Sequence, residues 1–175
     1  LGDVYKRQLP DDEVVCFIDA YDVLLLNSTD EIERRFLRLD VDLVVTEDKV
    51  SNGLDRFFRE RVLYGRFNGL LLNSGTYIGY NWRVKQMFKW MSENYDFTDY
   101  YLDDQVMLTA YCNANPDRIY TDGKGEIFLT VINRENPDLS TCVLHYPGNG
   151  DMCPLLSQLG YTPVSYTHLR AHETL

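Results

Sequence analysis

Two aspartates stand in the middle of an apolar stretch, VVCFIDAYDVLLL, at residues 14–26. Carboxylates such as Asp19 and Asp22 are rarely buried unless they are paired or hold a metal ion. Side chains three residues apart point to opposite faces of a continuing strand, so these two converge only if the chain turns at Ala20 and Tyr21. Adjacent carboxylates repel each other, and a divalent cation relieves that repulsion. The pattern therefore indicates a cation site, with a plain surface turn after a strand as the alternative.

A further candidate ligand is His145, which ends a second apolar segment and precedes a glycine-rich one. A hard cation held by a few carboxylates commonly takes substrate phosphates as its remaining ligands, and manganese also accepts an imidazole nitrogen. Gly148 and Gly150 would let backbone amides approach a phosphate closely. These residues favour a metal-bound diphosphate substrate, while a strand followed by a Pro-Gly turn is the simpler explanation.

Two polar clusters are additional candidates for a binding site. The tripeptide Asn73-Ser74-Gly75 interrupts an apolar segment and is expected to form a loop that presents amide and hydroxyl groups to sugar hydroxyls. Asp103 and Asp104 open a predicted helix, where the dipole favours negative charge. In a cleft, one of these carboxylates could instead orient a sugar or act as a base on an acceptor hydroxyl. A literal Asp-x-Asp at residues 40–42 precedes a strand and is interpreted as a loop.

The elements that must position these residues alternate along the chain. Short apolar, β-branched segments predict strands at residues 13–19, 42–46, 117–122, 126–132 and 141–146. Helical periodicity predicts helices at 27–39, 81–94 and 102–112, and a short helix within a long loop at 51–69. The alternation predicts an α/β domain with a largely parallel sheet.

Several side chains in these segments have an expected place. Ser28 and Glu31 form a capping-box pattern at the start of the first helix. The spacing predicts one buried face for Ile32, Phe36 and Leu39 in that helix, and another for Val84, Phe88 and Met91 in the second. The first strand is expected to be buried, with Cys16 as a small core residue.

Composition limits the class of protein. The 175 residues are enough for one domain with a sizeable core, and 45% of them are hydrophobic. No apolar run is long enough to span a bilayer, and no signal peptide opens the chain. A net charge of -10 argues against nucleic-acid binding, and either cation binding or solubility alone accounts for it. The four cysteines lack a CxxC pair, which argues against a zinc ribbon and leaves Cys142, His145 and Cys153 as an alternative soft-metal cluster.

The two ends differ from the rest of the sequence. Residues 1–8 (LGDVYKRQ) and 164–175 (VSYTHLRAHETL) resemble translated sequencing-adapter sequence. The natural segment is therefore expected to be residues 9–163, without either biological terminus. His168 and His172 fall in the second tail, which leaves His145 as the histidine of the domain.

Four motifs, taken in order, resemble the glycosyltransferase domain of procollagen-lysine hydroxylases (procollagen-lysine 2-oxoglutarate 5-dioxygenases), with the collagen galactosyltransferases as a looser match. They are CFIDAYDVLL, LLLNSGTYIGY, LDDQVML, and VLHYPGNG with LSQLGY, and the resemblance extends over most of residues 12–161. It implies a Rossmann-like, metal-dependent glycosyltransferase of the GT-A type. Residues 9–163 would then be an N-terminally truncated domain, since most of the nucleotide-binding half would lie before residue 9.

The resemblance also implies roles for residues at matching positions. The implied Mn²⁺ ligands are Asp19, Asp22 and His145. The implied contacts with the donor sugar are Asn73, Ser74 and Gly75. The implied sugar and acceptor site comprises Asp103 and Asp104, as catalytic carboxylates, and Gln105. The implied phosphate contacts are Gly148, Asn149 and Gly150, displaced by the intervening Tyr146 and Pro147. The family's uracil-stacking Cys-Trp-Pro is absent after the segment TEDKV.

These observations predict a manganese-dependent glycosyltransferase that moves a sugar from a UDP-sugar to a hydroxyl acceptor. By resemblance, the acceptor is hydroxylysine or galactosyl-hydroxylysine of collagen-like chains, and the location is the endoplasmic reticulum lumen or the secretory pathway. One alternative is a non-catalytic, degenerate transferase domain, which the missing uracil-stacking segment favours. Another is a phosphoaspartyl phosphatase-like α/β hydrolase with Asp19 as nucleophile, although such enzymes carry Asp-x-Asp rather than Asp-x-x-Asp.

Overall fold

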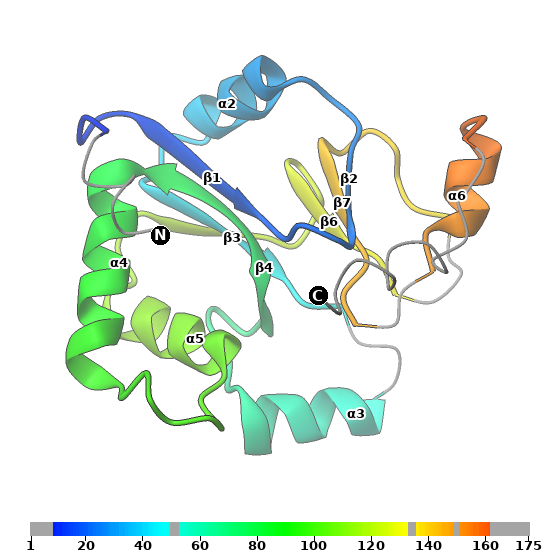
Figure 1. Cartoon of the computed structure of the whole chain (residues 1–175). Helices are drawn as coiled ribbons and strands as arrows, with labels where there is room; N and C mark the ends of the chain where they lie inside the picture. Colours follow the sequence, from blue (N-terminus) through cyan, green and yellow to red (C-terminus); the bar gives the residue numbers. More distant parts are fainter. Residues whose placement is uncertain (1–8, 50–52, 133–135, 149–150, 162–175) are drawn as a thin grey trace, which may run out of the picture.

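The computed structural model describes residues 9–49, 53–132, 136–148 and 151–161. Helices surround two small sheets in this part of the chain (Figure 1). The elements, in chain order, are β1 (Val14–Ile18), β2 (Val23–Leu25), α2 (Thr29–Arg38), β3 (Leu43–Glu47), α3 (Gly53–Phe58), the π-helical η1 (Arg59–Leu63), β4 (Leu72–Tyr80), α4 (Asn81–Asn94), α5 (Asp104–Ala114), β5 (Ile119–Asp122), β6 (Phe128–Thr130), β7 (Val143–His145) and α6 (Cys153–Gln158). No helix in these ranges is both long enough and apolar enough to cross a membrane.

The sheets are mixed rather than largely parallel. The larger sheet has the strand order β1-β4-β3-β5 and the smaller one β2-β7-β6. β4 is antiparallel to both of its neighbours, and β2 is antiparallel to β7. β3 with β5 and β6 with β7 are the parallel pairs of the described strands. The predicted α/β class is confirmed, whereas the expectation of a largely parallel sheet is wrong.

The connection between β3 and β4 explains the antiparallel pairing. Parallel neighbours need a connection that crosses back over the sheet. Here the connecting segment with α3 lies beyond the end of the larger sheet at which β3 finishes (Figure 1). The chain then returns to that same end, where β4 begins beside the last residue of β3. The backbone amide of Asp48 donates to the carbonyl of Leu71 (2.8 Å), which closes the excursion at its base. β4 therefore runs back along β3.

β1 is an edge strand and not the buried strand that its composition predicts. Among the described strands it pairs with β4 alone. Cys16 and Phe17 are exposed, so the expectation of a core cysteine is wrong. The Phe17 ring stacks on Tyr77 of β4 with centroids 4.9 Å apart, which covers part of its apolar surface.

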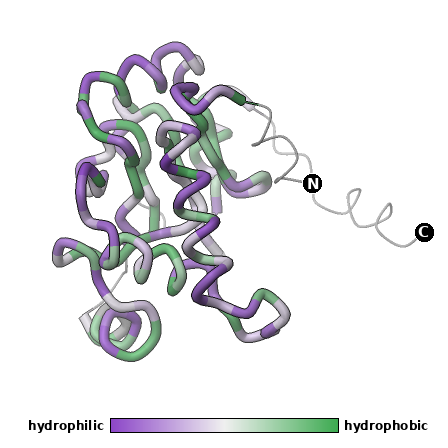
Figure 2. Tube along the Cα trace, turned by 90° about the vertical axis from the view of Figure 1, so that its left-hand side faces the viewer, coloured by the Kyte–Doolittle hydropathy of each residue, from purple (hydrophilic) through white to green (hydrophobic). Residues whose placement is uncertain are grey.

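Two apolar clusters pack on opposite faces of the larger sheet. Leu43 and Val45 face the cluster that α4 and α5 complete, whereas Val44 faces the cluster completed by α2 and the smaller sheet. This is the period-two alternation of a strand covered on both sides. Figure 2 looks at the molecule from the side of α4 and shows many hydrophilic residues along that outer helix.

The two outer helices match their predicted pattern to different degrees. In α2, Ser28 is the N-cap and accepts from the backbone amide of Glu31 (3.3 Å), as the capping box predicts. Ile32 and Phe36 are buried, and Leu39 packs beside them.

In α4, Val84 and Met91 are buried as predicted, but Phe88 is exposed and Met87 is buried instead. A helical stripe through Val84 and Met91 passes through Met87 three residues on, which leaves Phe88 at its edge.

Candidate metal centre

The turn between β1 and β2 joins the two sheets at the point where the apolar stretch is interrupted. The backbone amide of Asp19 donates to the carbonyl of Gly75 in β4 (2.9 Å). At the other end of the turn, the carbonyl of Asp22 accepts from the amide of Tyr146, just after β7 (2.8 Å). One aspartate is therefore anchored to the larger sheet and the other to the smaller sheet, with a turn between them as the sequence predicts.

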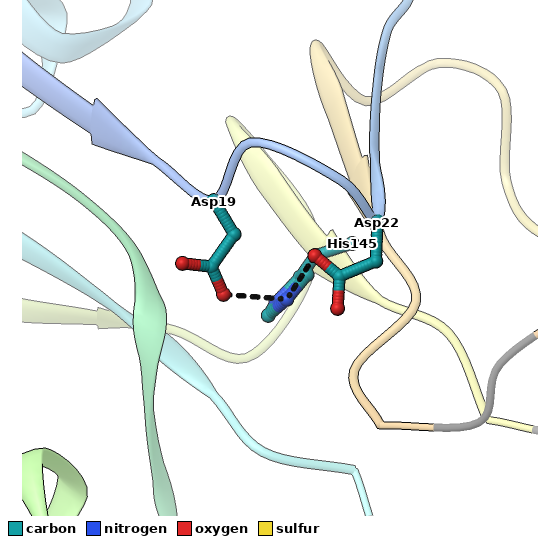
Figure 3. A group of neighbouring side chains, drawn as sticks. All are labelled: Asp19, Asp22 and His145. Carbon is teal, nitrogen blue, oxygen red and sulfur yellow. Dashed lines mark ion pairs between the residues drawn. The ribbon is translucent and has the colours of Figure 1, made fainter. Parts of the chain in front are cut away.

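Three side chains converge at this junction (Figure 3). The Nε2 atom of His145 lies 3.3 Å from Asp19 Oδ2 and 3.5 Å from Asp22 Oδ1. One ligand atom from each residue lies within 4.8 Å of the other two, which is close enough for the three to share a metal ion. The His145 side chain is 1% exposed, whereas those of Asp19 and Asp22 are 44% and 29% exposed. The group is closed on the imidazole side and open to solvent on the carboxylate side.

The electrostatics of the group fit a bound cation. Burial raises the pKa of Asp19 above its ordinary value, nearby His145 lowers it, and the negative charges of Asp22 and Asp104 raise it further. Both ring nitrogens of His145 are buried and form no hydrogen bond with the described part of the chain. Nε2 instead faces the carboxylate oxygens of Asp19 and Asp22 at 3.3 and 3.5 Å, and a cation between these three atoms would bind to all of them. Two carboxylates and one imidazole are also a donor set that manganese accepts.

Gly75 contacts the group directly. A Cβ atom at this position would overlap both Asp19 Oδ2 and His145 Cε1, and it would lie 2.9 Å from His145 Nε2. Any side chain here would displace the ligands. The absence of a side chain at Gly75 is therefore a condition for the three ligand residues to meet.

The expected loop at residues 73–75 is wrong, because these residues lie within β4. They form an irregularity in it: β4 pairs with β3 at Asn73 and again at Tyr77, and residues 74–76 are extra. Asn73 Oδ1 accepts from the amide of Gly75 (2.9 Å), and Thr46 Oγ1 lies 2.7 Å from Thr76 Oγ1. These bonds hold the extra residues in a bulge beside Asp19, Asp22 and His145, the candidate metal-binding group.

The start of α5 lies beside the same group. Asp103 is the N-cap and accepts from the amide of Gln105 (2.8 Å), which is the capping role that its position predicts. Asp104 accepts from Ser74 Oγ (3.0 Å), and its charge contributes to the raised pKa of Asp19. The structure thus brings Asp104 and Ser74 toward the metal-binding group.

Comparison with known protein families identifies the family of this chain. Residues 3–153 match the family model described as the PLOD GT domain. The chain belongs to the PLOD GT-domain family. The predicted family is thus confirmed, and the chain is a glycosyltransferase-type domain of the α/β class.

Other comparisons add little. A search of curated proteins gives no match. Among 14 matching chains of known structure is an active-site mutant of LgtC, 16% identical to this chain. That match covers 93% of this chain and 67% of the LgtC chain with a TM-score of 0.48, which is too distant to carry an argument.

The sequence prediction for this PLOD GT domain missed Asp48. Asp48 is buried at the end of β3, where Gln105 Nε2 donates to its Oδ2 (3.3 Å). Arg59 Nη1 of η1 lies 3.6 Å from the same oxygen. The carboxylate therefore connects β3, α5 and η1 near the carboxyl end of β3. An acidic residue directly after an apolar strand, as at Asp19, was the signal that could have revealed it.

The side chain of Gln105 binds Asp48 in this PLOD GT domain. Its side chain is buried, and its amide nitrogen donates to Asp48. Gly148 is exposed with a φ of 73°, a backbone conformation that favours glycine. Asn149 and Gly150 lie outside the described residues.

The two remaining metal-like patterns of the sequence, Asp-x-Asp and the cysteine pair, contribute no further metal-binding cluster. Asp40 and Asp42 lie in a loop, as expected, where Arg118 reaches both carboxylates at 3.1 and 2.9 Å. Cys142 is buried and Cys153 is exposed. Within the described ranges, Asp19, Asp22 and His145 form the one cluster of three side chains suited to hold a metal ion.

Proposed function

We propose that this PLOD GT domain binds Mn²⁺ and transfers a sugar from a UDP-sugar to a hydroxyl acceptor. The observation that supports the proposal most strongly is the convergence of Asp19, Asp22 and His145 within 4.8 Å. Family membership supports the sugar-transfer chemistry. The donor set of two carboxylates and one imidazole supports manganese as the ion.

Each of the three side chains would supply one ligand atom to the ion. Asp19 and Asp22 supply two negative charges from the solvent-exposed side, while the buried ring of His145 supplies a neutral donor. Three protein donors leave further coordination positions for diphosphate oxygens. When bound, the ion would act as a Lewis acid that stabilises the charge of the departing nucleotide.

The neighbouring polar residues are assigned to the sugar and the acceptor. Ser74 and Asp104 lie beside the metal-binding group, which supports a role in orienting the donor sugar. Asp103 or Asp104 is proposed to position the acceptor hydroxyl or accept its proton. The roles of Asn73 and Gln105 rest on family membership, because their side chains bind Gly75 and Asp48 in this structure.

The acceptor and the location are inferred from the family. A PLOD GT domain is expected to act on hydroxylysine or galactosyl-hydroxylysine in collagen-like chains. That substrate would place the protein in the endoplasmic reticulum lumen or the secretory pathway. Both inferences are independent of the metal-binding geometry.

Calorimetric titration with Mn²⁺, in the presence and absence of UDP, tests the metal-dependent step. We expect UDP to strengthen Mn²⁺ binding, because its diphosphate supplies ligands that the protein lacks. Asp19→Ala should weaken binding by about 10-fold or more. Asp12→Ala, which removes another exposed carboxylate, is the matched control and should bind Mn²⁺ normally.

Equal Mn²⁺ affinity in the Asp19→Ala variant and the unaltered chain would refute the proposed metal site. A turnover assay then separates an enzyme from a binding module. If Mn²⁺ and UDP-sugar bind but no sugar is transferred or hydrolysed, the non-catalytic alternative is correct.

A further inference from the structure

A cavity of about 340 Å³ lies between α2 and the segment that joins β5 to β6. α2 runs along the top of the molecule in Figure 1. None of the residues that line this cavity belongs to the metal-binding group. The lining residues that matter here are polar or charged: Arg34, Arg35, Arg38, Lys124, Glu126 and Ser140.

Most of the charged side chains that line the cavity are cations. Four of the lining side chains are cations, and Glu126 is an anion. Glu31 adds a second carboxylate, since it accepts from Arg34 Nε (2.7 Å) and Arg35 Nε (2.8 Å). These hydrogen bonds lower the pKa of Glu31 to about 2, so it is ionised at neutral pH. Asp122 and Asp138 accept from the backbone amides of the lining residues Glu126 and Ser140, so these neighbouring carboxylates also offset part of the positive charge of the lining.

One of the arginines is fixed in place by the chain. Arg35 Nη1 donates to the carbonyl of Glu126 (2.7 Å) and to that of Ser140 (2.8 Å). Its Nε donates to Glu31 at the same time. This arginine therefore connects α2 to two distant segments and gives the cavity a preorganised wall.

Two other cations are available to a ligand. Arg38 and Lys124 are exposed, and neither forms an ion pair or hydrogen bond with another described residue. They come from different segments, one from the last turn of α2 and the other from the β5–β6 connection. Gly125 follows Lys124 with a φ of 76°, so the turn that carries Lys124 has a shape that favours glycine.

The helix dipole explains only part of this arrangement. Cations in the last turn of a helix interact favourably with its carboxyl end, which accounts for Arg35 and Arg38. It does not account for Lys124, which belongs to another segment. The helix dipole also does not account for the cavity between α2 and the segment that joins β5 to β6.

We propose that this cavity binds a phosphate or sulfate group of a small molecule, at a site separate from the metal centre. Guanidinium groups present paired donors that match the oxygens of a tetrahedral anion, and lysine adds a compact charge. Arg38 and Lys124, which pair with no other described residue, can together neutralise the two charges of a phosphate monoester or the single charge of a sulfate ester. The volume is within the range of small-ligand sites. The proposal is independent of the sugar-transfer function.

An NMR titration of the whole chain with inorganic phosphate, and separately with sulfate, tests this site. We expect saturable shifts in the backbone amides of residues 34–39 and 124–126. The double substitution Arg38→Ala with Lys124→Ala should weaken binding about 10-fold or more. Arg61→Ala with Lys89→Ala removes the same charge from other exposed positions and should leave the affinity within about twofold.

The outcomes distinguish a site from general electrostatics. Tighter binding of phosphate than of sulfate would favour a phosphate ester over a sulfate ester as the ligand class, and the reverse order would favour a sulfate ester. The proposal is overturned if chloride at matched ionic strength reproduces the shifts, or if the Arg38 and Lys124 double variant binds as the unaltered chain does. Because both side chains are exposed, the variants should fold. The reversal Arg38→Glu with Lys124→Glu provides a second test, with complete loss expected.

Discussion

The imidazole of His145 is buried at the end of β7, whereas the two carboxylates that face it lie on a short turn. Its side chain is 1% exposed, so the surrounding atoms restrict its position, and neither ring nitrogen forms a hydrogen bond with a described residue. Asp19 and Asp22 are anchored through their backbones but expose their side chains. An arriving ion would therefore meet a rigid nitrogen and two adjustable oxygens.

Gly75→Ala is expected to abolish this arrangement without unfolding the chain. The added methyl would overlap Asp19 Oδ2 and His145 Cε1, so the ligands must separate. We expect Mn²⁺ affinity, measured by calorimetry, to fall about 10-fold or more. Circular dichroism should show unchanged secondary structure.

Gly53→Ala is the matched control for that substitution, because no atom lies within 4 Å of the position that its Cβ would take. Its Mn²⁺ affinity should equal that of the unaltered chain. If Gly75→Ala also binds Mn²⁺ normally, Gly75 is not a steric condition of the site.

At this scale, residue chemistry predicted that Asp19, Asp22 and His145 are candidate ligands that lie together, and the structure brings them together, but their surroundings were not predicted. The spacing of Asp19 and Asp22 requires a turn, and the structure has that turn. Nothing in the sequence pattern places Gly75 against His145, since that contact depends on how β4 pairs with its neighbours. Asp48 differs, because its place after an apolar strand was visible in the sequence, although its partners in α5 and η1 were not.

Among the elements, α2 has the clearest determinants of stability. Ser28 caps its first turn, and Glu31 connects that turn to Arg34 and Arg35. Asp30 and Glu31 at the start, with Arg35 and Arg38 at the end, also complement the helix dipole. The local sequence therefore determines this helix, and its prediction needed no tertiary information.

The Glu31→Gln variant should lose a pH-dependent part of this stability. The pKa of Glu31 falls from 4.5 to about 2 in the folded chain, because Arg34 and Arg35 donate to it. The stabilisation is present above pH 4.5 and is lost as the pH falls toward 2. We expect a small decrease in Tm at pH 7, since solvent screens exposed pairs, and a smaller one at about pH 2, where Glu31 is partly protonated.

Thermal denaturation from about pH 2 to pH 7 measures this difference. Glu33 lies on the same helix and is exposed, so Glu33→Gln serves as the control. Its Tm should differ little from that of the unaltered chain at any pH. A difference between Glu31→Gln and the unaltered chain that persists undiminished at the acid end of this range would contradict the assignment.

Strand pairing was less predictable than strand position. Periodicity identifies β3 and β4 as apolar segments, but it does not say which neighbours they choose or in which direction. The direction of β4 follows from where the connection after Asp48 lies. In its bulge, the bond from the Gly75 amide to Asn73 is local, whereas the contact between Thr46 and Thr76 exists only once β3 and β4 are paired.

Over the whole molecule, packing is uneven. β3 is buried on both faces, whereas α3 and η1 carry large apolar side chains that face solvent. These exposed side chains are Leu54, Phe57, Phe58, Val62 and Leu63. A segment that buries little apolar surface gains little from tertiary packing, so it should open before the sheet does.

Hydrogen exchange should reveal this unevenness directly. Backbone amides of α3 and η1 are expected to exchange at least about 100-fold faster than those of β3. α2 is the matched comparison, because it is also a surface helix but buries Ile32 and Phe36. Equal protection of α3 and α2, measured by NMR or mass spectrometry, would contradict the expectation.

The hydrogen bond from Asp48 to Leu71 has a consequence for how such chains diverge. Because it joins the two ends of the excursion, insertions or deletions between them need not displace either strand. Shortening the bulge at residues 74–76 would instead shift Gly75 away from His145. Descendants of a common ancestor should therefore vary in length at the first place and keep a constant length at the second.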